Sequence, residues 1–173
     1  MTHDPAAPAA EPDRDAAAAM WAQYRAAHPD VPLTDPPYTV EHFGDSVRLA
    51  DELLALVTSG RKRGTSELLS AFDETPDEIP QQGSHWIACD GAGAPRAVIR
   101  TTDVRIGPFS SADAEFAAAE GEDDLSLKSW QREHRRYWQR TAAARGATWS
   151  EDDLIMFERF AIVWPPELAE SGV

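Results

Sequence analysis

A lysine and a threonine lie three residues apart in a short basic, glycine-containing segment, Gly60-Arg61-Lys62-Arg63-Gly64-Thr65. Lys62 can supply a positive charge or, if burial lowers its pKa, a base. Thr65 supplies a hydroxyl, which becomes a nucleophile when a neighbouring base takes its proton. The segment can therefore form an anion site or a small catalytic centre.

The same segment follows directly after a predicted helix. From Ser46 to Ser59 apolar residues recur at helical spacing, and Gly60 falls where that helix needs a left-handed residue to end it. A simpler role also fits, in which Gly60 caps the helix and the three cations that follow complement the negative end of its dipole. Taken alone, these residues favour the simpler role.

Acidic residues and one histidine further along the chain offer groups for proton transfer. The run 120–124 holds four carboxylates, and it also fits a solvated loop that caps the following helix. His134 on that helix is a candidate acid or base near neutral pH, although a packed histidine is the commoner outcome. The five histidines are scattered and include no HExxH motif, so no zinc site is predicted.

The predicted elements around these groups are a mixture of helices and strands. We expect helices over 13–27, 45–59, 111–120 and 126–145, with a further short helix around Leu68, Leu69 and Phe72. We expect strands over 85–90 and 97–106, joined by a Gly-rich turn, and over 154–164. Strands separated by helices without a regular βαβ order indicate an α+β fold.

A charged pair, Glu158 and Arg159, interrupts the last of these otherwise apolar strands. Alternation along the strand puts Glu158 on the same face as Phe160 and Arg159 on the other. Such a pair is either a buried structural bridge or faces a cleft, and the structural role is the one we expect.

Length and composition predict one domain in a reducing compartment. The chain has 173 residues and a single cysteine, Cys89, so no intrachain disulfide can form. It has no apolar run near the roughly 20 residues that span a bilayer and no secretory signal pattern, so we predict a cytoplasmic location. We expect a disordered tail over 1–12, a single domain with an N-terminal helical extension over 13–164, and a C-terminal tail over 165–173.

The net charge of −14 argues against a polyanionic partner such as RNA. The charge is unevenly distributed, because residues 60–145 hold 12 Lys or Arg and 14 Asp or Glu, a net of −2. This central region can therefore still form a basic groove.

The pattern Gly60-x-Lys62-x-x-Thr65 resembles the signature of the ASCH domain, a relative of the PUA fold. The resemblance is to the longer bacterial ASCH proteins and continues through further segments in the expected order, namely 43–45, 49–53, 95–102, 119–122, Trp130 with His134, and 158–160. It covers roughly residues 38 to 164. It implies a small, partly open β-barrel flanked by helices.

The resemblance also implies roles for three residues. In ASCH proteins that act as amidohydrolases on N4-acylated cytidine-type nucleosides, a Lys-Thr-Glu set is catalytic. The match assigns Lys62 to activation, Thr65 to nucleophilic attack and Glu122 to proton transfer. Because the glutamate lies in an Ala-Glu-x-Glu segment, Glu120 remains an alternative.

Longer ASCH proteins are also associated with metal-assisted cleavage of single-stranded RNA, which implies a divalent cation such as Mg or Mn held loosely by the acidic loop. In such a reaction Lys62 would stabilise the charge developing on phosphate. The candidates for substrate or RNA binding are Arg61, Arg63, Arg96, Arg100, Lys128, Arg132 and His134. A basic helix face such as that of Arg132 is more often simply solvated.

Three functions remain open at this point. The first is a ribonuclease, which we favour because the compact amidohydrolases of the family are shorter than this chain. If it is correct, a positive groove should surround Lys62. A nucleoside amidohydrolase predicts an enclosed pocket that is too small for a polymer. A non-catalytic module that binds RNA or a modified nucleotide predicts binding through Lys62 without turnover, so whether the protein is a hydrolase at all stays open.

Overall fold

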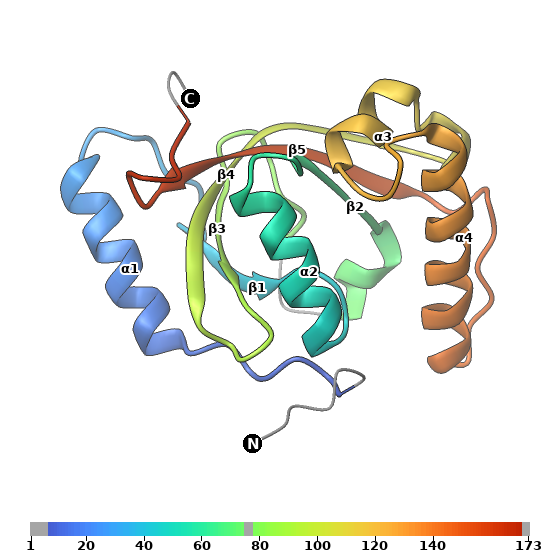
Figure 1. Ribbon diagram of the computed structural model, residues 1–173, viewed down its shortest axis with the longest axis horizontal. Helices are drawn as coiled ribbons and strands as arrows, with labels where there is room; N and C mark the ends of the chain where they lie inside the picture. Colours follow the sequence, from blue (N-terminus) through green and yellow to red (C-terminus); the bar gives the residue numbers. More distant parts are fainter. Residues whose placement is uncertain (1–6, 75–77, 171–173) are drawn as a thin grey trace.

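A curled five-stranded sheet forms the centre of the molecule in the computed structural model, which describes residues 7–74 and 78–170 (Figure 1). The strands are β1 (Thr39–His42), β2 (Gly64–Leu68), β3 (His85–Cys89), β4 (Pro95–Gly107) and β5 (Ile155–Trp164). Their order in the sheet is β1-β3-β4-β5-β2. β1 runs parallel to β3, and the other neighbours are antiparallel, so β1 and β2 form the two edges.

Four helices surround this sheet: α1 (Arg14–Ala27), α2 (Val47–Thr58), α3 (Ala114–Glu120) and α4 (Leu127–Ala144). Each begins at a side chain that accepts a hydrogen bond from a backbone N–H of the first turn; these caps are Asp13, Ser46, Asp113 and Ser126. Two short 3-10 helices, Leu69–Glu74 and Phe109–Ser111, complete the elements. Among the described helices, none has both the length and the apolar character required to cross a membrane.

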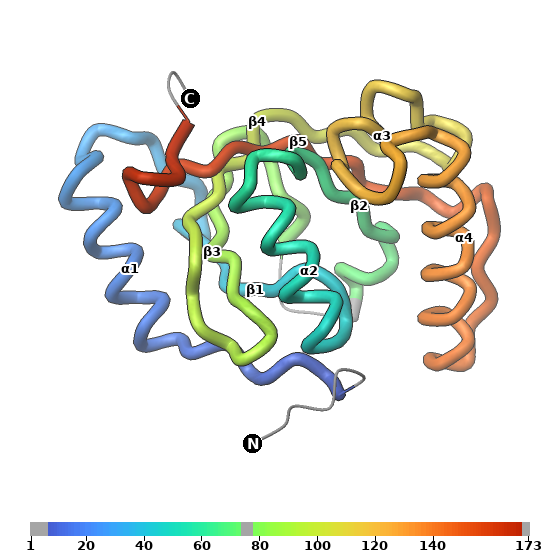
Figure 2. Tube along the Cα trace, viewed as in Figure 1, coloured from blue at the N-terminus to red at the C-terminus, as the bar shows by residue number. Residues whose placement is uncertain are grey.

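The helices cover the sheet at separate places. In Figure 1, α1 and α4 stand at opposite ends of the molecule with α2 between them, and Figure 2 shows the same separation along the chain trace. Each place has its own apolar cluster. The α2 cluster includes Leu54, Val57, Ile99 and Phe160, the α1 cluster includes Tyr24, Ile87 and Val98, and the cluster of α3 and α4 includes Phe116, Trp130, Trp138 and Phe157. Three separate clusters leave room for a cavity between α2 and α4.

The α+β class is confirmed, and so are the four long helices and the three predicted strands, each within a few residues of its expected ends. The short helix expected at Leu68 and Leu69 is wrong in part. Leu68 ends β2, and the residues from Leu69 to Glu74 form a 3-10 helix. The edge strands β1 and β2 were not predicted, because β2 carries Thr65, Ser66 and Glu67 in a row and shows no apolar alternation.

The N-terminal residues 7–12, expected to be disordered, are hydrogen-bonded to the domain. The Ala10 N–H donates to the Gly91 carbonyl at 3.0 Å, and the Val47 N–H donates to the Ala7 carbonyl at 3.0 Å. This segment satisfies backbone groups that the β3–β4 turn and the start of α2 would otherwise leave to water. The first six residues of the expected tail lie outside the described residues.

Candidate functional site

A cavity of about 770 Å³ opens between the inner face of the sheet, α2 and α4. Its volume lies in the range of about 300–1,000 Å³ that is typical of small-molecule sites. Lys62, Thr65, Glu122 and His134 all line it, although they come from three different parts of the chain. The structure therefore brings together the three residues assigned to catalysis and one of those assigned to binding.

Lys62 enters this cavity because the chain reverses sharply at the end of α2. Gly60 has φ +86°, the left-handed conformation expected of it, and the N–H groups of Arg61 and Lys62 both donate to the Leu56 carbonyl, at 3.0 and 2.9 Å. The reversal leads directly into β2. As a result the Lys62 side chain turns inward and is only 1% exposed.

The buried ammonium of Lys62 is held by two carboxylates. Its Nζ lies 2.6 Å from Oε1 of Glu122 and 3.6 Å from Oε2 of Glu120, and it also donates to the Glu120 carbonyl at 3.4 Å. Burial by itself would lower the pKa of Lys62, but the charges of Glu120 and Glu122 outweigh burial and raise it. Lys62 is therefore a cation and a hydrogen-bond donor at neutral pH, not the base that burial alone would produce.

Glu120, the alternative carboxylate, is buried and held by several polar partners. It is 1% exposed, accepts a hydrogen bond from the Ser66 hydroxyl at 2.6 Å, and lies 3.2 Å from Nε2 of His134. Burial would raise the pKa of Glu120, but His134, Lys62 and these hydrogen bonds lower it well below its ordinary range. Glu120 is thus a fixed anion, whereas Glu122, with 30% of its side chain exposed, is the more accessible carboxylate.

His134 balances the charge of Glu120 from α4. Its Nδ1 lies 3.0 Å from the Trp130 carbonyl, and its ring stacks on the Trp130 indole with 4.2 Å between centroids. Burial would lower the pKa of His134, but the attraction of Glu120 prevails and raises it. Two cations, Lys62 and His134, therefore face two anions in one buried network.

Thr65 lies on β2, directly opposite Glu158 on β5. Glu158 is 3% exposed, and its Oε1 accepts hydrogen bonds from the Thr101 hydroxyl at 2.6 Å and from the Trp86 indole N–H at 3.3 Å. Burial raises the pKa of Glu158 to about 7, with these two hydrogen bonds opposing the rise and the Glu41 carboxylate adding to it. The cavity thus contains a carboxyl group that titrates at neutral pH.

The structural bridge expected for Glu158 is wrong. Its neighbour Arg159 points to the other face and pairs with Glu115 at 3.1 Å, while Glu158 lines the cavity. The alternation of the strand had placed Glu158 on the Phe160 face. That face lines the cavity because β5 curls around it, which periodicity alone does not show.

Three of the four predicted binding arginines outside α4 are bonded to other residues of the chain. Arg61 is exposed and donates to the Asp123 carbonyl at 2.6 Å, whereas Arg63 pairs with Glu170 at 2.6 Å. Arg96 pairs with Asp90 at 2.6 Å beside the β3–β4 turn, and Arg100 lies on β4 opposite His85. In the described structure none of these four arginines lines the cavity.

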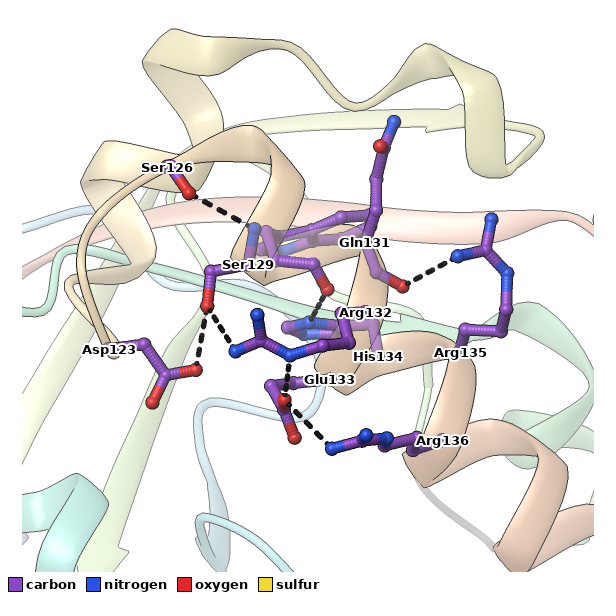
Figure 3. Close-up of polar contacts among 10 residues, drawn as sticks. Asp123, Ser126, Ser129, Gln131, Arg132, Glu133, His134, Arg135 and Arg136 are labelled. Atoms are coloured by element: carbon purple, nitrogen blue, oxygen red, sulfur yellow. Dashed lines mark hydrogen bonds and ion pairs between the residues drawn. The ribbon is translucent and has the colours of Figure 1, made fainter.

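The two predicted cations on α4, Lys128 and Arg132, are exposed and also lie outside the cavity. Figure 3 shows that arginines of this helix are bonded to other side chains of the same helix. Arg132 donates to Ser129 and Glu133, and Arg136 also donates to Glu133. The α4 face is therefore a surface network of ion pairs and hydrogen bonds.

The positive groove expected around Lys62 is not found in the described structure. The acidic residues that line the cavity number ten: Asp35, Glu41, Glu52, Glu67, Glu78, Glu120, Glu122, Asp123, Glu133 and Glu158. The Lys and Arg residues number four, namely Arg48, Lys62, Arg136 and Arg140, and His134 is a further cation of the lining. Such a lining repels phosphate and is compatible with an uncharged or cationic ligand.

The described residues include no group of three or more His, Cys, Asp or Glu side chains that could hold a metal ion. The carboxylates nearest to Lys62 are already engaged by Lys62, His134 and Ser66. These residues therefore do not fit a resident Mg or Mn ion.

Comparisons with known proteins bear on the family and the fold of the chain. A family model described as the ASCH domain matches residues 39–164. A crystal structure of an ASCH domain from Lactobacillus crispatus is similar with a TM-score of 0.75 and 24% identity, covering 87% of this chain and 96% of that one. A crystal structure of a protein from Enterococcus faecalis has a TM-score of 0.75 and 30% identity, covering 87% and 89%. No curated protein matches.

Gly121 fixes the loop that carries Glu122 against Lys62. It has φ +73°, and an added Cβ would lie 2.3 Å from the Arg61 carbonyl oxygen and 2.9 Å from Cα of Lys62. We expect Gly121→Ala to cost more than the roughly 1–2 kcal/mol of the left-handed conformation alone, because the loop must also move away. Urea unfolding measures the cost.

The control is Gly146→Ala, whose φ of +71° is similar but whose added Cβ meets nothing within 4 Å. Gly146→Ala should lose only the free energy of unfolding that the left-handed conformation costs. Equal losses in the two variants would contradict the close packing of this loop on Lys62.

Glu120 should make stability depend on acid pH. Its pKa in the folded state lies below its ordinary 4.5, so the stabilisation is present above that pH and is lost as pH falls toward the folded value. We expect Glu120→Gln to lower the free energy of unfolding by about 3–5 kcal/mol at neutral pH, because the substitution leaves buried cations without their anion. The free energy of unfolding of this variant should also change less with pH below 4.5.

Urea unfolding across pH tests this, with Glu133→Gln as the control. Glu133 also pairs with arginines but is 38% exposed, so its loss should stay under about 1 kcal/mol. A Glu120→Gln variant as stable as Glu133→Gln would show that the buried network does not stabilise the fold.

Proposed function

The chain belongs to the ASCH domain family, and on that premise we propose that it hydrolyses the amide of N4-acylated cytidine-type nucleosides in the cavity around Lys62. The observation that supports this most strongly is the cavity itself, because Lys62, Thr65 and Glu122 all line it and its volume is typical of small-molecule sites. Membership of a PUA-like family supports a nucleotide-like ligand in general, and the cavity narrows it to a small one.

Amide hydrolysis needs a nucleophile, a group that stabilises the oxyanion, and carboxylates that hold charge or carry protons. The Thr65 hydroxyl would attack the acyl carbon. The Lys62 ammonium would donate hydrogen bonds to the developing oxyanion, and its burial strengthens that interaction. Glu122 would hold the ammonium in place through its 2.6 Å contact, and it is the carboxylate that the family resemblance assigns to proton transfer.

The acidic lining favours a nucleoside over a polymer. Each phosphate of an RNA strand would enter a cavity with ten carboxylates, four Lys or Arg side chains and His134 among its described residues, which is unfavourable. A free nucleoside carries no phosphate and meets no such penalty. The ribonuclease favoured by chain length, and a module that binds RNA through a basic groove, therefore fit the described charges less well.

Rates on two substrates, with and without magnesium or manganese, test the proposal. Purified wild-type protein should release acetate from N4-acetylcytidine, independently of added metal and with little dependence on salt. Lys62→Ala should reduce kcat/KM by about 10²-fold or more, since a positioned oxyanion donor is removed. Arg14→Ala, on the exposed start of α1 and outside the cavity, should keep wild-type activity.

The same assay on labelled single-stranded RNA decides between the functions. Cleavage of RNA that Lys62→Ala abolishes, with no turnover of N4-acetylcytidine, would show a ribonuclease instead. Salt-sensitive RNA binding without turnover of either substrate would show a binding module.

A further inference from the structure

The side chain of Glu158 is placed to act on Thr65. The two residues are directly opposed in the antiparallel pair of β2 and β5, and both line the cavity. Directly opposed side chains on one face of a sheet have Cβ atoms about 4.5–5.5 Å apart. The carboxyl group of Glu158 and the hydroxyl of Thr65 therefore project into the same space from neighbouring strands.

The bonds that Glu158 makes leave it able to accept a proton. In the described structure, the hydrogen bonds from Thr101 and Trp86 both go to Oε1, which leaves Oε2 for a partner in the cavity. Both donors are uncharged. Neither of the buried cations, Lys62 and His134, is ion-paired with Glu158. A buried carboxylate without a cation is a stronger base than an ion-paired one.

The groups around Glu158 are uncharged donors and further carboxylates, which also favour its action as a base. β3 and β4 present the uncharged donors Trp86 and Thr101, β1 presents the Glu41 carboxylate, and β2 carries Glu67 two residues beyond Thr65. Burial, assisted by Glu41, raises the pKa of Glu158 to about 7 against these hydrogen bonds. At neutral pH both protonation states are populated, which is the optimum for a group that takes and returns a proton.

The other two carboxylates are ion-paired, unlike Glu158. Glu122 is bound to the Lys62 ammonium at 2.6 Å, and Glu120 is held by Lys62, His134 and Ser66. A proton passed from Thr65 to either of them would neutralise a carboxylate that is ion-paired to a buried cation, which is costly.

We propose that Glu158 is a catalytic residue of this cavity, the base that accepts the hydroxyl proton of Thr65. The inference rests on the proposed amidohydrolase function. As the Thr65 oxygen bonds to the acyl carbon, its proton passes to Glu158. When the bond from that carbon to N4 breaks, Glu158 returns the proton to the leaving nitrogen.

The second half of the reaction restores the enzyme. Water attacks the acyl ester on Thr65, and Glu158 accepts a proton from that water. The carboxylic acid leaves as the carbon–oxygen bond to Thr65 breaks, and the proton goes back to the threonine oxygen. The sum is amide plus water giving acid plus amine, with no other reactant.

Three variants test this in the N4-acetylcytidine assay across pH. In the wild type, kcat/KM should rise with pH through a midpoint near 7, because the ionised form of Glu158 is the active one. Glu158→Gln should lower kcat/KM by about 10²-fold or more and remove this rise. Glu115→Gln, which loses only a surface pair with Arg159, should match the wild type.

Thr101→Val is the third variant and keeps Glu158 in place. It removes a hydrogen bond that favours the ionised carboxylate, so the midpoint of the pH profile should move to higher pH. This variant keeps the proposal open to contradiction even if Glu158→Gln fails to fold.

A direct titration separates the two proposals, because it needs no substrate. The indole N–H of Trp86 donates to Glu158, so its NMR shift should titrate through neutral pH and lose that titration in Glu158→Gln. A flat Trp86 shift, or a Glu158→Gln variant with wild-type kcat/KM and pH profile, would overturn the role of Glu158. Absence of turnover by a wild type whose Trp86 shift does titrate would overturn the proposed function instead.

Discussion

A single buried ammonium, that of Lys62, sets the arrangement of this molecule around its cavity. A cation that is 1% exposed is tolerable only if anions meet it, and here they come from the end of α3 and from the loop that follows it. Glu120 in turn needs a second cation, which α4 supplies as His134. The segment that carries Lys62 is therefore tied to α3 and α4, which lie far along the chain from it, by a requirement for charge neutrality.

The cavity has two chemically different sides, and Thr65 lines it from β2, opposite Glu158. One side is the ionised network of Lys62, Glu120, Glu122 and His134, in which every carboxylate has a cation. The other side is the sheet, where Glu158 is buried among uncharged donors and gains or loses its proton near neutral pH. A fixed positive charge beside a hydroxyl, with a proton acceptor opposite, is the arrangement that acyl transfer requires.

Several features of this site could be predicted from local sequence. Gly60 marks the end of α2 in the sequence. Because Lys62 and Thr65 follow it closely, both are expected just beyond that helix. The helices and the β3–β4 hairpin carry their own periodicity and caps. β2 could not be found in this way, because its polar residues pair with a strand about 90 residues further along the chain.

The roles of the charged residues depended on partners that are distant in sequence. Arg63 looks like a binding residue beside Lys62, yet Glu170 at the far end of the chain holds it. The acidity of the cavity has the same origin, since its carboxylates come from segments between residues 35 and 158. For Glu158, alternation gave the correct face, but only the curl of the sheet shows that this face lines the cavity.

The protonation state of Lys62 tests the account most directly, and the chain offers a clean measurement because it contains only two lysines, Lys62 and Lys128. Protein labelled with ¹³C at lysine Cε should give two NMR signals, which Lys128→Arg assigns. We predict that Lys62 remains protonated above its ordinary pKa of 10.5, with Glu122→Gln lowering that limit. A Lys62 signal that titrates near neutral pH would show a neutral amine in the cavity and would contradict the account.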